Sequence, residues 1–392
     1  MRMIHTSDWH LGRAFHQVGL QAAQSAFLDH LVEVVRSESV AAVVVSGDIY
    51  DRALPAPDTV AMLSDAVERL IDAGAAVVLS SGNHDSAIRL GFASRLLERS
   101  GLHIRTSIED IGRPVLVGDA AIHALPYLEP SLSAGPLGTG ERTHAGVLRA
   151  AMERVRSSLA AGGARRSVVM AHAFVTGGAT SESERDISVG GVAAVPPEVF
   201  AGVDYAALGH LHGRQQVSES VRYSGSPVAM SFSEASHTKG SWLVDLSGEV
   251  PVTDFVAAPV ERPLVLLRGT LDDLLGDPRH TAAESAWCQV TLTDPIRPLG
   301  AMERLRVRFP HTLDLRFAPT GSVTTMSAYA ASLTERSDLD VCCDFLTHVR
   351  GGHGADEDER LLLGRAVEGA RLRRSAREGE GGRSIHRVTG AA

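Results

Sequence analysis

The chain has 392 residues, of which 44% are apolar and 22% charged, and its formal net charge is −9 at pH 7. This length and apolar content can support two domains with sizeable cores, while the negative charge argues against a generally basic coat for nucleic acid but not against a local basic groove. No run approaches eighteen consecutive apolar residues and the first residues lack the apolar stretch of a signal peptide, so we expect a cytoplasmic protein with no membrane partner.

The first hundred residues alternate short apolar runs with helical patterns. The expected elements are, in order, a strand ending near Ser7, a helix over 21–38, a strand over 41–45, a helix over 57–73, a strand over 75–79 and a helix over 86–99. Strands that alternate with helices in this way are typical of a parallel α/β sheet.

The following part of the chain, to about residue 258, is richer in strands. Apolar runs at 114–117, 121–125 and 167–170 predict strands, and a helical pattern covers about 143–161. We therefore predict a second sheet that packs on the first.

A change of pattern marks the last third of the chain. The proline-flanked stretch 259–263 predicts a domain boundary, and 264–318 follows with strand, helix, strand, helix and strand. Residues 338–350 and 356–376 predict helices, and 378–392 is expected to be disordered. The predicted division is a main domain of residues 1–260, a small α/β domain of residues 261–335, and C-terminal helices with a flexible tail in residues 336–392.

Five predicted strands end in clusters of polar side chains. These clusters are Asp8-Trp9-His10, Gly47-Asp48-Ile49-Tyr50-Asp51, Gly82-Asn83-His84-Asp85, Ala171-His172 and Gly209-His210-Leu211-His212. Because the carboxyl ends of the strands form the ligand crevice of an α/β sheet, these residues can converge although they lie far apart in sequence. The two-residue spacing of Asp8 and His10 lets both side chains point the same way in an extended chain.

The clusters offer imidazole nitrogens, carboxylate oxygens and an amide oxygen, without a thiolate. Such donors suit manganese, iron or zinc rather than a structural zinc site, and they are too numerous for one ion. Two ions about 3.5–4 Å apart can share a bridging carboxylate and activate a water for in-line attack on phosphorus. Each cluster alone has an ordinary structural explanation, but five together favour a metal site, because burying such polarity without compensation is costly.

This ordered set of motifs resembles that of the calcineurin-like metallophosphoesterases, over about residues 1–245. The resemblance implies a four-layer fold, in which a two-sheet β-sandwich is flanked by helices, and a site for two divalent ions. Carried over position by position, it assigns Asp8, His10, Asp48 and His212 to one ion, and Asp48, Asn83, His172 and His210 to the other. Asp48 would therefore bridge the two ions.

Longer motifs are similar, more narrowly, to those of the SbcD family of bacterial DNA-repair nucleases. They are TSDWHLG at 6–12, GDIYDRALP at 47–55, GNHDSAIRL at 82–90, LPYLEP at 125–130 and YSGSPVAMSFSE at 223–234. The small domain after residue 263 also resembles that family's capping domain. The resemblance implies an exonuclease on duplex DNA ends and an endonuclease on hairpins or single strands, with manganese as the metal.

The same resemblance implies a partner, an SMC-like ATPase of the SbcC type, and a homodimer of this chain within a heterotetramer. The chain has no GxxxxGK[ST] loop, so any ATP dependence would come from that partner. The apolar stripe from Leu361 to Leu372 is expected either to dock on the partner's coiled coil or to pack on its own domain.

The resemblance also suggests roles for residues around the ligands. His84 is expected to protonate or hydrogen-bond the leaving oxygen, with Asp51 orienting its imidazole, and Asp85 to cap a helix that begins at about Ser86. An exonuclease gains nothing from reading bases, so DNA contacts should go to phosphates. Candidate contacts, for which ordinary surface positions are the alternative, are Arg13, Arg52, Arg89 and Ser226.

Two alternatives stay open at this point. One is another phosphodiesterase or phosphatase of the same superfamily, although residues 51–53 read Asp-Arg-Ala where the protein phosphatases have Asp-Arg-Gly, and the chain continues far beyond the motifs. The other is a non-catalytic scaffold, which is disfavoured because a competent donor fills every proposed ligand position.

Overall fold

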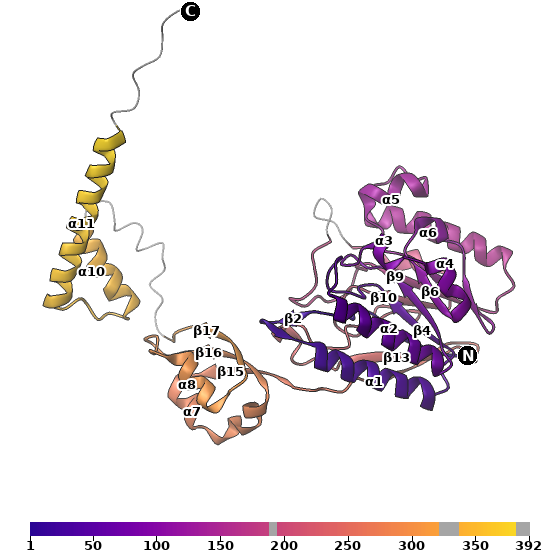
Figure 1. The fold of residues 1–392 in the computed structure, drawn as a ribbon, viewed down its shortest axis with the longest axis horizontal. Helices are drawn as coiled ribbons and strands as arrows, with labels where there is room; N and C mark the ends of the chain where they lie inside the picture. The colour runs from indigo at the N-terminus through magenta and orange to yellow at the C-terminus, as the bar shows by residue number, and fades with distance from the viewer. Residues whose placement is uncertain (188–193, 321–336, 382–392) are drawn as a thin grey trace, which may run out of the picture. The chain divides into compact units, whose positions relative to one another are not determined.

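The computed structural model describes residues 1–187, 194–320 and 337–381, with the side chains of the last helix described as far as Arg371. The chain forms two compact units (Figure 1). The first unit comprises Met1–Leu266 with Ser285–Trp287, and the second comprises Leu267–Glu284 with Cys288–Ala392. Within the described ranges, none of the helices has the length and apolarity needed to cross a membrane.

The first sheet has six strands in the order β14-β13-β1-β4-β5-β6. Its bounds are β1 (Arg2–Thr6), β4 (Ala42–Ser46), β5 (Ala76–Ser80), β6 (Leu102–Arg105), β13 (Gly240–Asp245) and β14 (Val252–Ala257). The four strands from β1 to β6 run parallel, and β13 and β14 add an antiparallel edge. The parallel strands therefore present their carboxyl ends at one edge, as the sequence pattern predicted.

The second sheet also has six strands, in the order β11-β12-β10-β9-β8-β7. Its bounds are β7 (Val115–Val117), β8 (Ala120–Ala124), β9 (Arg166–His172), β10 (Tyr205–Gly209), β11 (Gln215–Gln216) and β12 (Val221–Tyr223). Strands β8, β9, β10 and β12 are parallel. A separate short hairpin, which was not expected from the sequence, pairs β2 (Ala14–Phe15) with β3 (Val18–Gly19).

Alternating side chains on the strands place one core between the sheets and one on each outer face. Val44 of β4 and Met170 of β9 lie in the core between the sheets, whereas Val43 and Val45 face outward. The outer core of the first sheet includes α1 (Gln21–Ser37) and α2 (Pro57–Asp72), and that of the second includes α5 (Pro130–Leu137) and α6 (His144–Ala161). The predicted α/β fold, two packed sheets flanked by helices, is thus confirmed.

The prediction of one continuous helix over residues 86–99 is wrong. The chain instead forms α3 (Ala87–Leu90) and α4 (Ser94–Leu97), followed by a 3-10 turn, with Ala93 between them at a φ of +57°. At Gly91 the backbone lies so close to Thr106 that a Cβ would come within 2.3 Å of its Oγ1 atom. This long-range contact interrupts a segment whose local pattern is helical.

The chain after residue 263 has the predicted order of elements. A three-stranded sheet contains β15 (Leu264–Gly269), β16 (Trp287–Leu292) and β17 (Thr312–Phe317), with α7 (Leu271–Gly276) and α8 (Ala301–Arg308) between its strands. Helices α10 (Asp338–Val349) and α11 (Glu357–Gly381) follow, and α11 continues past the predicted end at residue 376. Residues 382–392 of the predicted tail lie outside the described residues. The three-domain division stays a prediction.

Candidate metal centre

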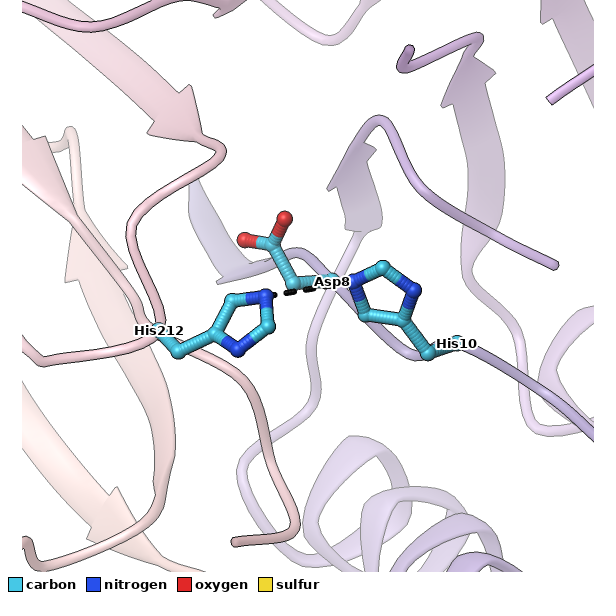
Figure 2. Close-up of side chains that lie close together, drawn as sticks. All are labelled: Asp8, His10 and His212. Atoms are coloured by element: carbon cyan, nitrogen blue, oxygen red, sulfur yellow. Dashed lines mark hydrogen bonds between the residues drawn. The ribbon is translucent and has the colours of Figure 1, made fainter. Parts of the chain in front are cut away.

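The predicted ligand residues lie at the carboxyl ends of parallel strands from both sheets. They are Asp8 and His10 after β1, Asp48 after β4, Asn83 after β5, His172 at the end of β9, and His210 and His212 after β10. All of these side chains except that of the partly exposed Asn83 are buried. Figure 2 shows Asp8, His10 and His212 close together, with the two imidazoles facing each other.

Four ligand residues have backbone conformations that favour glycine. The φ angles are +53° at Asp8, +43° at His10, +51° at Asp48 and +106° at His210. Each costs roughly 1–3 kcal/mol for a side chain with a Cβ, so surrounding bonds must hold it. The Asp8 N–H donates to the Gly47 carbonyl at 3.1 Å, and the His210 N–H donates to the Asp8 carboxylate at 3.0 Å. The loops therefore hold one another in place.

Asp48 lies between the two groups of ligands. Its Oδ2 atom is 3.5 Å from His10 Nε2 and 3.4 Å from His172 Nε2. Ligand atoms within 4.8 Å of one another form three sets among the described residues: Asp8 with His10 and His212, His10 with Asp48 and His84, and Asp8 with Asp48 and His172. Asp48 lies near His10 on one side and His172 on the other, as a bridging carboxylate must.

The two ring nitrogens of His172 have different neighbours, a main-chain carbonyl at Nδ1 and the Asn83 amide at Nε2. Its Nδ1 atom is 3.0 Å from the Ser46 carbonyl, which can only accept, so Nδ1 carries the proton. Nε2 of the neutral ring is then an acceptor, and it lies 2.8 Å from the Asn83 amide oxygen. Imidazole nitrogen and amide oxygen are both ligands that a divalent cation can bind at this place.

A second close contact between ligand atoms lies beside Asp48. His10 Nε2 and His212 Nε2 are 3.1 Å apart. His212 Nδ1 is 2.6 Å from the Ser183 hydroxyl, whereas His10 Nδ1 lies 3.6 Å from Asp51 Oδ1 and has no hydrogen-bond partner among the described residues. The donor set therefore fits metal ions, which bind neutral imidazole and carboxylate.

The electrostatics of the site point to the same conclusion. Burial raises the pKa of Asp8, and the negative charge of Asp48 raises it further. Burial also acts to raise the pKa of Asp48, but nearby imidazoles outweigh it and hold that pKa below the usual value. Burial lowers the pKa of His10 to about 4 and that of His210 to about 3, so both rings are neutral near pH 7. With His10 neutral near pH 7, part of the positive charge that lowers the pKa of Asp48 is missing, and a bound cation would replace it.

His84 faces the same site, and Asp51 contacts its imidazole through the main chain. The Asp51 main-chain carbonyl accepts from His84 Nδ1 at 2.9 Å, and His84 Nε2 is 4.0 Å from Asp48 Oδ2. The Asp51 carboxylate instead accepts from Arg13 at 3.0 Å. The peptide group of Asp51, and not its carboxylate, therefore aligns the imidazole.

Asp85 does not cap the helix that follows it. Its carboxylate accepts from the N–H groups of Ile49, Tyr50 and Gly82 at 3.1, 3.0 and 2.9 Å. Ser86 is the N-cap residue of α3, without a side-chain cap bond. Asp85 thus fastens the loops after β4 and β5 to each other, because their amides would otherwise lack partners.

The four residues predicted to contact DNA differ in how far they are exposed to solvent. The Arg52 side chain is 79% exposed and lies 3.7 Å from Asp51. Arg13 is largely enclosed and also donates to the Ser183 carbonyl at 3.2 Å, while Arg89 donates to the Ala53 carbonyl at 3.1 Å. Ser226 is fully buried and donates to the Val228 carbonyl, so the prediction that it contacts DNA is not supported.

Sequence reasoning missed a buried polar group behind His212. It consists of the buried Ser183, Glu234 and Lys239 and the partly exposed Glu184, all within hydrogen-bonding reach of His212 or of one another. One signal was available in the sequence, because Lys239 is the only lysine of the chain.

Comparisons with known proteins agree with this geometry. Residues 1–214 match the family described as calcineurin-like phosphoesterase, and residues 260–350 match the family described as type 5 capsule protein repressor C-terminal domain. A relative from Staphylococcus saprophyticus, named as the D subunit of the nuclease SbcCD, is 26% identical over 360 residues, covering 90% of this chain and 94% of the relative. The resemblance found in the motifs is therefore confirmed.

Two solved structures are also similar to the chain. TT1561 of Thermus thermophilus is 12% identical, with a TM-score of 0.38 over 65% of this chain and 98% of that one. The structure titled GAP50, the anchor in the inner membrane complex of Plasmodium, is 12% identical, with a TM-score of 0.37 over 82% of this chain and 98% of that one.

Gly82 allows a close approach that the site requires. A Cβ at this position would lie 2.1 Å from Asp48 Oδ1, whereas a Cβ at Gly163 would meet nothing within 4 Å. We expect Gly82→Ala to displace Asp48 and to weaken Mn²⁺ binding at least about 10-fold, with a loss of roughly 1–3 kcal/mol in stability. Calorimetric titration with Mn²⁺ measures this, with Gly163→Ala as the control. Equal affinity in both variants would contradict the central role of Asp48.

Proposed function

Because the chain belongs to the calcineurin-like phosphoesterase family, we propose that it is a metal-dependent DNA nuclease subunit that acts with an SMC-like ATPase in DNA repair and recombination. The similarity to the D subunit of the nuclease SbcCD over 90% of the chain supports a nuclease rather than another phosphoesterase. The observation that carries the proposal is the convergence of buried ligand atoms around Asp48: His10 Nε2 is 3.1 Å from His212 Nε2, and His172 Nε2 is 2.8 Å from the Asn83 amide oxygen. A cytoplasmic location remains an expectation.

Two divalent ions, for which we propose manganese, would occupy the centre. The ligands of one would be Asp8, His10, Asp48 and His212, and those of the other Asp48, Asn83, His172 and His210. When bound, the ions would lower the pKa of a water molecule and offset negative charge on phosphoryl oxygens. The chain supports them with neutral imidazoles, whose other nitrogens are already hydrogen-bonded in His172 and His212.

His84 is the residue that we propose for the leaving oxygen. Its Nδ1 atom is bonded to the Asp51 carbonyl, so Nε2 is the nitrogen directed at the centre. The side chain is 11% exposed, so a phosphodiester at the ligand edge can reach it. The imidazole would hydrogen-bond or protonate the oxygen on which negative charge develops.

Contacts to DNA phosphates would come from a small part of the predicted set. Arg52 is exposed beside the site, whereas the enclosed Arg13 bonds Asp51 and the Ser183 carbonyl. We assign Arg52 to phosphate binding and Arg13 to holding the loops that carry Asp51 and Ser183. Such contacts serve duplex ends, hairpins and single strands alike, because the phosphate backbone is common to all of them.

The C-terminal helix pair offers an apolar surface for the ATPase partner. Phe345 and Val349 of α10 are each 55% exposed, and Leu361 and Leu362 of α11 are 58% and 65% exposed. The described side chains of these two leucines are therefore uncovered. We propose that this surface packs on the partner's coiled coil, where apolar helix faces are buried.

A second apolar surface supports the homodimer. A cavity of about 800 Å³ opens beside α2 and is lined by Leu63, Val67, Ile71 and other apolar residues. Phe92 also lines this cavity and is 80% exposed. A hollow with a protruding aromatic side chain beside it suits a two-fold contact, because each copy can offer Phe92 to the other.

Manganese-dependent DNA cleavage tests the proposed function. We expect the purified chain, alone and with its ATPase partner, to degrade linear duplex DNA and to cut hairpins with Mn²⁺ present, and to lose this activity when EDTA removes the metal. A cyclic nucleotide offered in parallel should be hydrolysed far more slowly. Hydrolysis of the cyclic nucleotide without any DNA cleavage would instead favour a small-molecule phosphodiesterase.

Replacement of His84 tests the role of the imidazole. We expect His84→Ala to bind Mn²⁺ as the wild type does but to cleave DNA about 100-fold more slowly, because a positioned acid contributes about 10²–10⁴-fold. His353→Ala removes an exposed histidine and serves as the control. Single-turnover cleavage rates give the answer, and an unchanged rate in His84→Ala would exclude this role.

Replacement of Phe92 tests the homodimer. We expect Phe92→Asp to shift the chain from dimer to monomer in sedimentation velocity, because a carboxylate cannot be buried in an apolar hollow without a partner. Leu116→Asp changes a similarly exposed residue on β7 and should leave the dimer intact. Dissociation by both variants, or by neither, would argue against the proposed surface.

A further inference from the structure

The only lysine of the chain is buried behind the metal centre. The Lys239 side chain is 6% exposed, and its Nζ atom donates to the His212 carbonyl at 2.8 Å, to the Ser226 hydroxyl at 3.0 Å and to the Glu234 carboxylate. An ammonium group has three donors, and each of them has an acceptor here. All other basic side chains of the chain are arginines.

The acceptor Glu234 continues the chain of hydrogen bonds towards His212. Its side chain is fully buried and accepts from the Ser183 hydroxyl through Oε1 and from Lys239 through Oε2. The Ser183 oxygen lies 2.6 Å from His212 Nδ1. Glu234 Oε1 lies 3.7 Å from His212 Nδ1, but Glu234 belongs to none of the potential metal-binding groups among the described residues.

The direction of these hydrogen bonds follows from the chemistry of their ends. An ionised carboxylate can only accept, so the single proton of the Ser183 hydroxyl points to Glu234. The hydroxyl oxygen must then accept from His212 Nδ1–H. This arrangement leaves the lone pair of His212 on Nε2, 3.1 Å from His10 Nε2.

We propose that Lys239, Glu234 and Ser183 form a positioning relay that sets the tautomer and orientation of His212 and thereby the affinity of one of the two metal positions. The proposal rests on the proposed metal-dependent function and adds to it residues that touch neither metal nor DNA. Carboxylates behind ligand histidines strengthen metal binding in this way in other sites.

The two sides of the centre differ in this respect. His172 Nδ1 donates to the main-chain carbonyl of Ser46, which no side-chain substitution can remove. His212 depends on three side chains from two separate segments of the chain. Disturbing the relay should therefore lower the metal affinity at the position that His212 serves. The affinity at the position that His172 serves should not change.

The relay also accounts for a lysine in a chain that otherwise uses arginine. A guanidinium brings five N–H donors in a rigid plane, whereas the described surroundings of Lys239 offer three acceptors. Arginine at this position would leave buried donors unpaired or push Glu234 away from Ser183.

Removal of the Ser183 hydroxyl tests the relay, with Mn²⁺ as the probe. We expect Ser183→Ala to bind one Mn²⁺ about 10- to 100-fold more weakly than the wild type and the other with unchanged affinity, measured by calorimetric titration and by equilibrium dialysis. Ser183→Thr, which keeps the hydroxyl, should restore the affinity. Ser167→Ala is the matched control, because it removes a hydroxyl bonded to Asp204 at the opposite end of β9.

The outcomes separate this inference from the proposed function. If the wild type binds two ions and the folded Ser183→Ala variant binds both with unchanged affinity, the relay is overturned and the proposed function stands. If the wild type binds fewer than one Mn²⁺ per chain, the proposed function fails and the relay fails with it. Equal weakening of both ions, or equal weakening by Ser167→Ala, would indicate a general loss of structure and would also overturn the relay.

Two further variants test the relay from its other end. Glu234→Gln keeps the shape of the side chain but can donate as well as accept, so the direction of the Ser183 hydrogen bond is lost. Lys239→Arg keeps the positive charge but changes the donor geometry. We expect each to weaken the same single Mn²⁺ position at least about 10-fold. Wild-type affinity in both folded variants would exclude roles for Glu234 and Lys239 beyond packing.

Discussion

The burial of two carboxylates close together is the constraint on which the rest of the site depends. Asp8 and Asp48 are enclosed at the edge where the two sheets meet, and burial together with the charge of Asp48 raises the pKa of Asp8. Two buried carboxylates this close are costly unless one is protonated or a cation binds between them. The packing itself therefore favours a metal centre at this place.

The loops around the carboxylates are built to bring main chains unusually close. A Cβ at Gly82 or Gly209 would overlap atoms of the segment Ser46–Asp48, so glycine is required at both strand ends. Asp85 accepts from three amides of two loops, which joins the end of β4 to the end of β5. The strained backbone at the ligands is thus held by contacts between segments, as is common at functional sites.

The residues that orient the ligands were harder to predict than the ligands. Asp51 belongs to the motif at residues 47–55, but only the fold shows that its main chain aligns His84 while its carboxylate bonds Arg13. Ser226 stands in a long family motif, yet the structure buries it beside Lys239. Such roles depend on which atom of a residue faces its neighbour, and sequence spacing does not contain that information.

The sequence by itself determined the alternation of strands and helices and the donor residues at the strand ends, because local periodicity and residue chemistry are sufficient for both. Only the tertiary structure decided which residues of distant segments contact one another. The helix predicted over residues 86–99 is interrupted at Ala93, and Asp85 bonds two loops instead of capping a helix. Ser183 and Glu234 lie behind His212, where no sequence motif had placed them. These outcomes depend on atoms that meet across long stretches of chain, which no local pattern records.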